Sequence, residues 1–113
     1  RQLDLDAMRE AASFLAGVHD FAAFTANPKR TVNSTVRDVK RIGISRRGME
    51  ITIAVESNGF LYKMVRSIAG FLIRVGEGAI DPLQTPVVLK SRVRTAMVKT
   101  ALPQGLFLWN VRY

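Results

Sequence analysis

The sequence predicts an α+β fold: a mostly antiparallel sheet covered by helices on one face, in the order α-β-β-α-α-β. Segments with apolar residues at three- and four-residue spacing predict helices, and adjacent segments with alternating apolar and polar residues predict a strand hairpin. A closing apolar segment after a proline and a glycine predicts a last strand. Because 48% of the 113 residues are hydrophobic, the chain can form the core of a single domain.

A first helix is expected at residues 4–16. Its apolar residues share one helix face, at three- and four-residue steps: Leu5, Met8, Ala12 and Leu15. Asp4 or Asp6 can cap the start of this helix, because a carboxylate accepts hydrogen bonds from the first free N–H groups. Gly17 can end it.

An irregular segment, held in place by Phe21 and Phe24, is expected after this helix. Two strands are then expected as a hairpin, at residues 35–45 and 49–56, joined by a basic turn with a glycine. In the second strand, every other residue is a large β-branched apolar one: Ile51, Ile53 and Val55. This is the pattern of a strand buried on one face.

A second helix is expected at about residues 60–76, capped by Asn58 and ended by the glycines at 76–78. A shorter third helix is expected after Asp81, with four apolar residues: Val87, Val88, Val93 and Met97. The last residues, 105–113, are expected to form a closing strand in the centre of the sheet, with three apolar residues on one face: Leu106, Leu108 and Val111.

Charge narrows the possible partners. Seventeen Lys and Arg residues against nine Asp and Glu give a formal net charge of +8, which favours nucleic acid or an anionic membrane surface. The absence of cysteine excludes disulfides and Cys-based zinc sites, and the single histidine excludes a histidine cluster. The chain starts without Met, within a helix entry, so we expect it to be a piece of a longer protein; its first residues do not resemble a signal peptide.

The second helix combines an apolar face with positive charge. On a helical wheel one face holds Leu61, Met64, Val65, Ile68, Leu72 and Val75, and another holds Lys63, Arg66, Gly70 and Arg74. Arg66 lies near the boundary, with Tyr62 and Ile73 close to it on the wheel, so it is the best candidate for a half-buried guanidinium. Gly70 indicates close packing against the helix backbone. The simplest alternative is an ordinary solvated face; a membrane-surface helix is disfavoured, because the apolar face is needed to cover the sheet.

Self-contained catalytic chemistry is not visible. The sequence has no Gly-rich phosphate loop, no Ser-His-Asp arrangement and no metal-ligand spacing. The carboxylates fit structural roles at a helix start, in a basic strand and in a turn, and His19 fits a structural hydrogen bond as well as acid–base chemistry. The residues alone therefore predict a basic α+β domain that binds nucleic acid.

Three blocks resemble a known family. They are LAGVHDFAAF at 15–24, GFLYKMVRSIAGFLIRVGEG at 59–78 and GLFLWNVRY at 105–113. In this order, with a hairpin between the first two, they look like the C-terminal half of tRNA pseudouridine synthases of the TruA type. The resemblance covers essentially the whole chain. It implies that residues 1–113 form the C-terminal domain of a two-domain isomerase that converts uridine to pseudouridine in the anticodon arm of tRNA.

The resemblance also implies roles for single residues. Arg66 would form an ion pair with the catalytic Asp, which lies outside this chain in the N-terminal domain together with the active-site Tyr. Leu106 would pack against the target uracil. Lys63 and Arg74 are candidates for RNA binding because of their charge on the polar side of the second helix, where an ordinary solvated face is the alternative. His19, Asp20, Phe21 and Phe24 match the first block and are assigned to the architecture around the cleft.

No metal or organic cofactor is implied. The implied partners are tRNA, the N-terminal domain and, by analogy with bacterial relatives, a second copy in a homodimer, with no membrane; the implied compartment is cytoplasmic or organellar. Val93 stands where the family often has an acidic residue, and residues 84–89 lack its usual acidic helix, which leaves the structure of the third segment open. This domain alone is expected to be inactive. The alternatives are a non-catalytic RNA-binding module with the same fold and a dimerisation domain.

Overall fold

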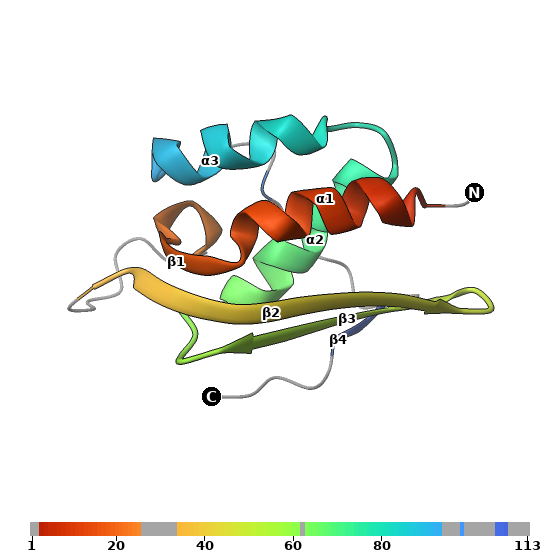
Figure 1. Ribbon diagram of the computed structural model, residues 1–113, viewed down its shortest axis with the longest axis horizontal. Helices are drawn as coiled ribbons and strands as arrows, with labels where there is room; N and C mark the ends of the chain where they lie inside the picture. The colour runs from red at the N-terminus through yellow and green to blue at the C-terminus, as the bar shows by residue number, and fades with distance from the viewer. Residues whose placement is uncertain (1–2, 26–33, 62, 94–97, 99–105, 109–113) are drawn as a thin grey trace.

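The structure is a computed structural model that describes residues 3–25, 34–61, 63–93, 98 and 106–108. Its elements, in chain order, are helix α1 (Leu5–Leu15), strand β1 (Gly17–Asp20), the 3-10 turn η1 (Ala22–Phe24), strands β2 (Val36–Arg47) and β3 (Glu50–Ser57), helix α2 (Met64–Gly76), the 3-10 turn η2 (Pro82–Gln84), helix α3 (Thr85–Ser91) and strand β4 (Leu106–Leu108). Figure 1 shows the helices stacked on one face of the sheet. The predicted α+β class is therefore confirmed.

The sheet has the strand order β1-β2-β3-β4. The pairs β1–β2 and β2–β3 are antiparallel, and β4 runs parallel to β3. Within the described residues β4 lies at the end of the sheet, so the central position expected for the closing strand is wrong for this part of the chain. Strand β1 was not expected, because its four residues are too few to show a clear alternation.

Helix α1 begins and ends as predicted. The Asp4 side chain accepts a hydrogen bond from the N–H of Ala7 at 3.1 Å. After the last turn, Gly17 has a φ of +103°, a conformation that glycine adopts without the strain a side chain would add. This reversal turns the chain directly into β1.

The hairpin also forms as predicted, with a tighter turn. Only Gly48 and Met49 separate the two strands, since Arg47 pairs with Glu50. Gly48 has a φ of +62°, and Met49 does not have a positive φ, the combination of a two-residue turn with glycine first. Ile51, Ile53 and Val55 are buried beneath the helices, as their alternation predicted.

Helix α2 starts later than predicted, at Met64 rather than near residue 60. Asn58 is not its cap: the Asn58 side-chain oxygen accepts the N–H of Asp38 at 3.0 Å, which ties β3 to β2 instead. Lys63 occupies the cap position with a left-handed backbone (φ 56°). Gly59, Phe60 and Leu61 precede the helix and lead the chain from the end of β3 toward it, so they do not belong to the helix as predicted.

Helix α3 is shorter than predicted. It ends at Ser91, followed by Arg92 in a left-handed conformation, so Val93 lies beyond the helix and is exposed. Met97, the last apolar residue expected in it, lies outside the described residues. A helix forms here although residues 84–89 contain no acidic residue, because Val88 and Leu89 are buried against the rest of the core.

The core lies between the helices and the sheet. Phe21, Phe24 and Phe71 contact one another edge to face, with ring centroids 6.1 and 5.7 Å apart, a favourable arrangement for aromatic rings. Helices α1 and α2 approach closely at Gly76, where an added Cβ would lie 2.6 Å from the sulfur of Met8. The N–H of Asp4 donates to the carbonyl of Gly76 at 2.9 Å, which fixes the start of α1 to the end of α2.

None of the helices in the described part of the chain has the length and apolar character needed to cross a membrane.

Candidate functional site

Two of the predicted site residues, Lys63 and Arg66, lie together at the N-terminal end of α2. Both are exposed. The carbonyl of Lys63 accepts the N–H of Ser67 at 3.0 Å, which closes the first turn of the helix. Met64, Ser67 and Ile68 of this turn are fully buried. The backbone that carries Arg66 is therefore held by the core while its side chain remains outside.

The connection that leads into this turn is fixed to the sheet. The N–H of Asn58 donates to the carbonyl of Asp38 at 3.2 Å, and the Asn58 side chain accepts in return from the N–H of Asp38 at 3.0 Å. The hydroxyl of Ser57, which is buried, lies 3.1 Å from the carbonyl oxygen of Asp38 and 2.9 Å from that of Gly59. The last turn before the helix is closed by the N–H of Met64, which donates to the carbonyl of Leu61 at 3.0 Å.

The electrostatic environment at this end of α2 is positive. The side chain of the N-cap residue, Lys63, makes no capping hydrogen bond, and no acidic residue lies in the first turn of α2. The helix dipole places a partial positive charge at the same end as the two cationic side chains. Helix N-termini of this kind stabilise carboxylates and phosphates. The site therefore suits an anion brought to it from outside.

Arg66 is more exposed than the helical wheel predicted, so the expectation of a half-buried guanidinium is wrong for this chain. The prediction placed Arg66 at the edge of the polar face, with Tyr62 and Ile73 close to it on the wheel. Helix α2 begins only at Met64, so a wheel drawn from residue 60 extends the helix too far at this end. Tyr62 itself lies outside the described residues.

Gly70 and Arg74 also differ from their place on the polar side of the wheel. Gly70 is buried, as close packing against the backbone predicted, and Arg74 is half-buried. The Nε atom of Arg74 is buried and has no hydrogen-bond partner within the described residues. Arg74 lies eight residues beyond Arg66, about 12 Å along the helix axis, so the structure does not bring it together with Lys63 and Arg66. Its position in the last turn instead suits the negative end of the helix dipole.

Leu106, the predicted contact of the target base, is the first residue of β4. Its backbone pairs with Ile51 of β3 in parallel register. The side chain of Leu106 lies outside what the structure describes.

His19, Asp20, Phe21 and Phe24 have the contacts expected of structural residues. The His19 ring nitrogen Nε2 hydrogen-bonds with the carbonyl oxygen of Ala16 at 2.8 Å, and the ring lies edge-on to Phe21. The Asp20 carboxylate accepts from the N–H of Ala22 at 3.0 Å and from the hydroxyl of Thr35 at 2.6 Å. Its other oxygen lies 3.7 Å from Nε of Arg92. Asp20 thus joins β1, η1 and the end of α3.

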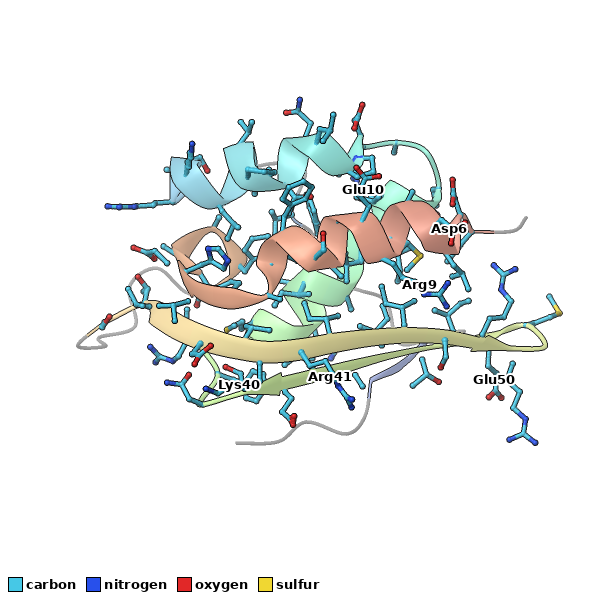
Figure 2. All side chains as sticks on the ribbon, in the orientation of Figure 1. Asp6, Arg9, Glu10, Lys40, Arg41 and Glu50 are labelled. Carbon is cyan, nitrogen blue, oxygen red and sulfur yellow. The ribbon has the colours of Figure 1, made fainter. Side chains whose placement is uncertain are left out.

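Charged residues on the two long strands form a second feature that the sequence did not single out. In the strand register, Arg41 lies opposite Glu56 and Arg47 lies opposite Glu50. The small residues Gly43, Ala54, Ser45 and Thr52 lie between them. Figure 2 shows Arg41 and Glu50 on the side of the sheet away from the helices, whereas Arg9 of α1 points between α1 and β2. Arg9 donates to the carbonyl of Ile44 at 2.9 Å and so fixes α1 to the sheet. The number of positive charges in the sequence does not distinguish Arg9, which fixes α1 to the sheet, from Arg41, which lies on the side of the sheet away from the helices.

No group of three or more His, Cys, Asp or Glu side chains that could hold a metal ion is present among the residues described.

Comparison with known proteins identifies the family. The family described as tRNA pseudouridine synthase matches residues 11–113. The chain is 43% identical over 112 residues to tRNA pseudouridine synthase A of Bacillus pumilus, a match that covers 99% of this chain and 45% of the relative. It is 44% identical over 111 residues to the protein of the same name from Thermoanaerobacter sp., a match that covers 98% of this chain and 45% of that relative.

A third relative, tRNA pseudouridine synthase A of Chlamydia muridarum, is 41% identical over 112 residues, which are 99% of this chain and 42% of the relative. The chain thus spans less than half the length of these relatives. The family match includes all of α2, with Lys63 and Arg66, as well as β4. The chain belongs to the tRNA pseudouridine synthase family.

Proposed function

We propose that the full-length protein isomerises uridine to pseudouridine in the anticodon arm of tRNA, and that residues 1–113 are its C-terminal domain. This domain binds the RNA and completes the active site, and alone it is inactive. The family match over residues 11–113 supports the activity. The observation that carries the role of the domain is the pair of exposed cations, Lys63 and Arg66, at the N-terminal end of α2, whose first turn holds no acidic residue.

Arg66 is proposed as the ion-pair partner of the catalytic Asp, which is contributed by an N-terminal domain. A guanidinium can donate two parallel hydrogen bonds to one carboxylate, which fixes its orientation and keeps it ionised. The partial positive charge at the N-terminus of α2 also stabilises the ionised carboxylate. The exposure of Arg66 in this chain supports the proposal, because a carboxylate from another domain requires an accessible partner.

The other site residues contact the RNA in this proposal. Leu106 at the start of β4 provides an apolar surface for the target uracil, which must leave its stack before it can react. Lys63 and Arg74 bind the RNA backbone, and they do so through charge rather than by reading bases. During the reaction the bond between C1′ and N1 breaks, a bond between C1′ and C5 forms, the proton leaves C5 and N1 gains a proton. The balance requires neither an oxidant nor a reductant.

The test is pseudouridine formation by the full-length protein with tRNA carrying tritium at C5 of uridine, since isomerisation releases that hydrogen. Arg66→Ala is expected to lower the rate by about 10²- to 10⁴-fold, because breaking a buried charge pair costs about 3–5 kcal/mol. Lys90→Ala, which removes one exposed positive charge from α3, is the matched control and should retain activity. Normal turnover by Arg66→Ala would refute its role. Salt-dependent tRNA binding by a wild-type protein that releases no tritium would indicate a non-catalytic RNA-binding module.

A further inference from the structure

The end of β3 carries hydrogen bonds that the fold of the hairpin does not require. Regular pairing between β2 and β3 ends at Val39 and Ser57, with a register shift between Val39 and Arg41. Beyond this point Asn58 continues the pairing with its side chain. Its Oδ1 takes the place of a backbone carbonyl and accepts the N–H of Asp38 at 3.0 Å, while its own N–H donates to the carbonyl of Asp38 at 3.2 Å.

Ser57 completes this group of bonds. It is one of the few buried polar residues of the described chain, 1% exposed. Its hydroxyl lies within hydrogen-bond distance of two carbonyl oxygens, that of Asp38 on β2 and that of Gly59 in the connection. The carbonyl of Asp38 also accepts the N–H of Asn58, so the buried hydroxyl links β2 to the connection at the point where the chain leaves the sheet. We call the bonds among Asp38, Ser57, Asn58 and Gly59 the β3 clamp.

The β3 clamp is connected to Arg66 by a short and restrained path. Leu61 is buried, its carbonyl accepts the N–H of Met64, and Lys63 then adopts a left-handed backbone before the helix begins. Arg66 is the third residue of α2. Because Leu61 is buried and bonded to Met64, we expect a shift of the chain at Asn58 to reach the first helical turn.

We propose that Ser57 and Asn58 are positioning residues for Arg66. By fixing the exit of the chain from β3, the β3 clamp holds the guanidinium in the orientation in which it meets a carboxylate. This inference rests on the proposed function of Arg66. It assigns the two residues no contact with substrate. Misplacing a catalytic group by about 1 Å can cost about 10²-fold in rate, so loss of the β3 clamp has a measurable kinetic effect.

The experiment uses the full-length protein and measures the single-turnover rate of tritium release at saturating tRNA, together with the tRNA Kd. Asn58→Ala is expected to lower the rate by about 10- to 100-fold and to leave the Kd within about twofold of wild type. Asn58→Asp keeps the accepting oxygen and should restore most of the rate. Ser57→Ala, which removes the hydroxyl with little change in volume, should reproduce the loss.

A matched control separates positioning from general destabilisation. Asp4→Ala removes the cap of α1. The loss of such a cap is expected to lower the melting temperature by a few degrees. The control should keep the wild-type single-turnover rate. In the Arg66→Ala background, Asn58→Ala should produce no further loss, because a positioning residue acts only through the group that it positions.

The inference is overturned if Asn58→Ala and Ser57→Ala keep the wild-type rate, if Asn58→Asp is as slow as Asn58→Ala, or if the two losses of Asn58→Ala and Arg66→Ala multiply. These outcomes differ from failure of the proposed function, in which Arg66→Ala itself turns over normally. An inactive Arg66→Ala protein with a fully active Asn58→Ala protein would leave the role of Arg66 intact and remove only the β3 clamp from the mechanism.

Discussion

A guanidinium that binds a carboxylate from another domain requires a fixed backbone and an accessible side chain. Arg66 has both, since Met64, Ser67 and Ile68 beside it are fully buried while Arg66 itself is exposed. Lys63 adds a second positive charge at the same helix end. Its left-handed backbone costs about 1 kcal/mol relative to glycine, a cost that the buried first turn of α2 offsets.

At the residue scale, the account predicts that Arg66→Lys cannot replace arginine. Lysine keeps the charge but lacks the planar fork that donates two parallel hydrogen bonds. The full-length Arg66→Lys protein is expected to form pseudouridine at least about tenfold more slowly than wild type, corresponding to about 1.4 kcal/mol. The tRNA Kd, measured by filter binding, should change little. A lysine variant with the wild-type rate would show that position 66 provides charge alone.

The sequence predicted the place of Arg66 on its helix but not its exposure. The helical wheel treated residues 60–63 as part of the helix. The predicted cap residue, Asn58, instead exchanges hydrogen bonds with Asp38 of β2: its side chain accepts the N–H of Asp38, and its own N–H donates to the Asp38 carbonyl. Such a bond joins residues that are 20 positions apart, and local periodicity carries no information about it.

At the scale of elements, the sequence predicted the two ends of α1 correctly, because a single residue type determines each end. Asp4 caps α1 and Gly17 follows its last turn, both as predicted. Strand β1 was missed because it exists only through pairing with β2. The position of β4 depends in the same way on long-range pairing with β3, which a single sequence does not reveal.

The close approach of α1 and α2 predicts the effect of a single methyl group. In Gly76→Ala the new Cβ would lie 2.6 Å from Sδ and 2.9 Å from Cγ of Met8, which is fully buried. Overpacking of this kind costs about 1–3 kcal/mol, while the gain in helix propensity is at most about 1 kcal/mol. We expect a net loss of stability of about 1–2 kcal/mol, measured by urea unfolding of the full-length protein.

The control for this substitution is Gly43→Ala in β2. An added Cβ at Gly43 meets nothing within 4 Å, and removing a glycine from a strand interior is expected to stabilise slightly. Equal destabilisation by the two substitutions would contradict the packing explanation.

At the scale of the whole molecule, the net charge of +8 gives binding to RNA a strong salt dependence. Each phosphate neutralised by a cation contributes about 0.7–0.9 to the slope of log K against log salt concentration. Lys63→Ala is therefore expected to weaken tRNA binding and to reduce the magnitude of this slope by roughly that amount. Lys90→Ala, on α3, should leave the slope unchanged. A Lys63→Ala protein with the wild-type slope would remove Lys63 from the RNA contact.

The core and the charged surface of the molecule have different roles. The helices and the sheet form a core that holds the start of α2, and the net positive charge of the chain favours an anionic partner. Composition and charge alone predicted nucleic-acid binding but no chemistry. The catalytic role proposed for this domain came only from the resemblance of the block that contains Arg66, because the residues of the chain alone show no self-contained catalytic arrangement.

The most direct test of this account is a single experiment on full-length Arg66→Ala, in which the tRNA Kd and the single-turnover rate at saturating tRNA are measured on the same preparation. The account predicts a Kd within about threefold of wild type and a rate lower by about 10²- to 10⁴-fold. A wild-type rate, or a loss of rate that disappears once tRNA is saturating, would contradict the pairing of Arg66 with a catalytic carboxylate.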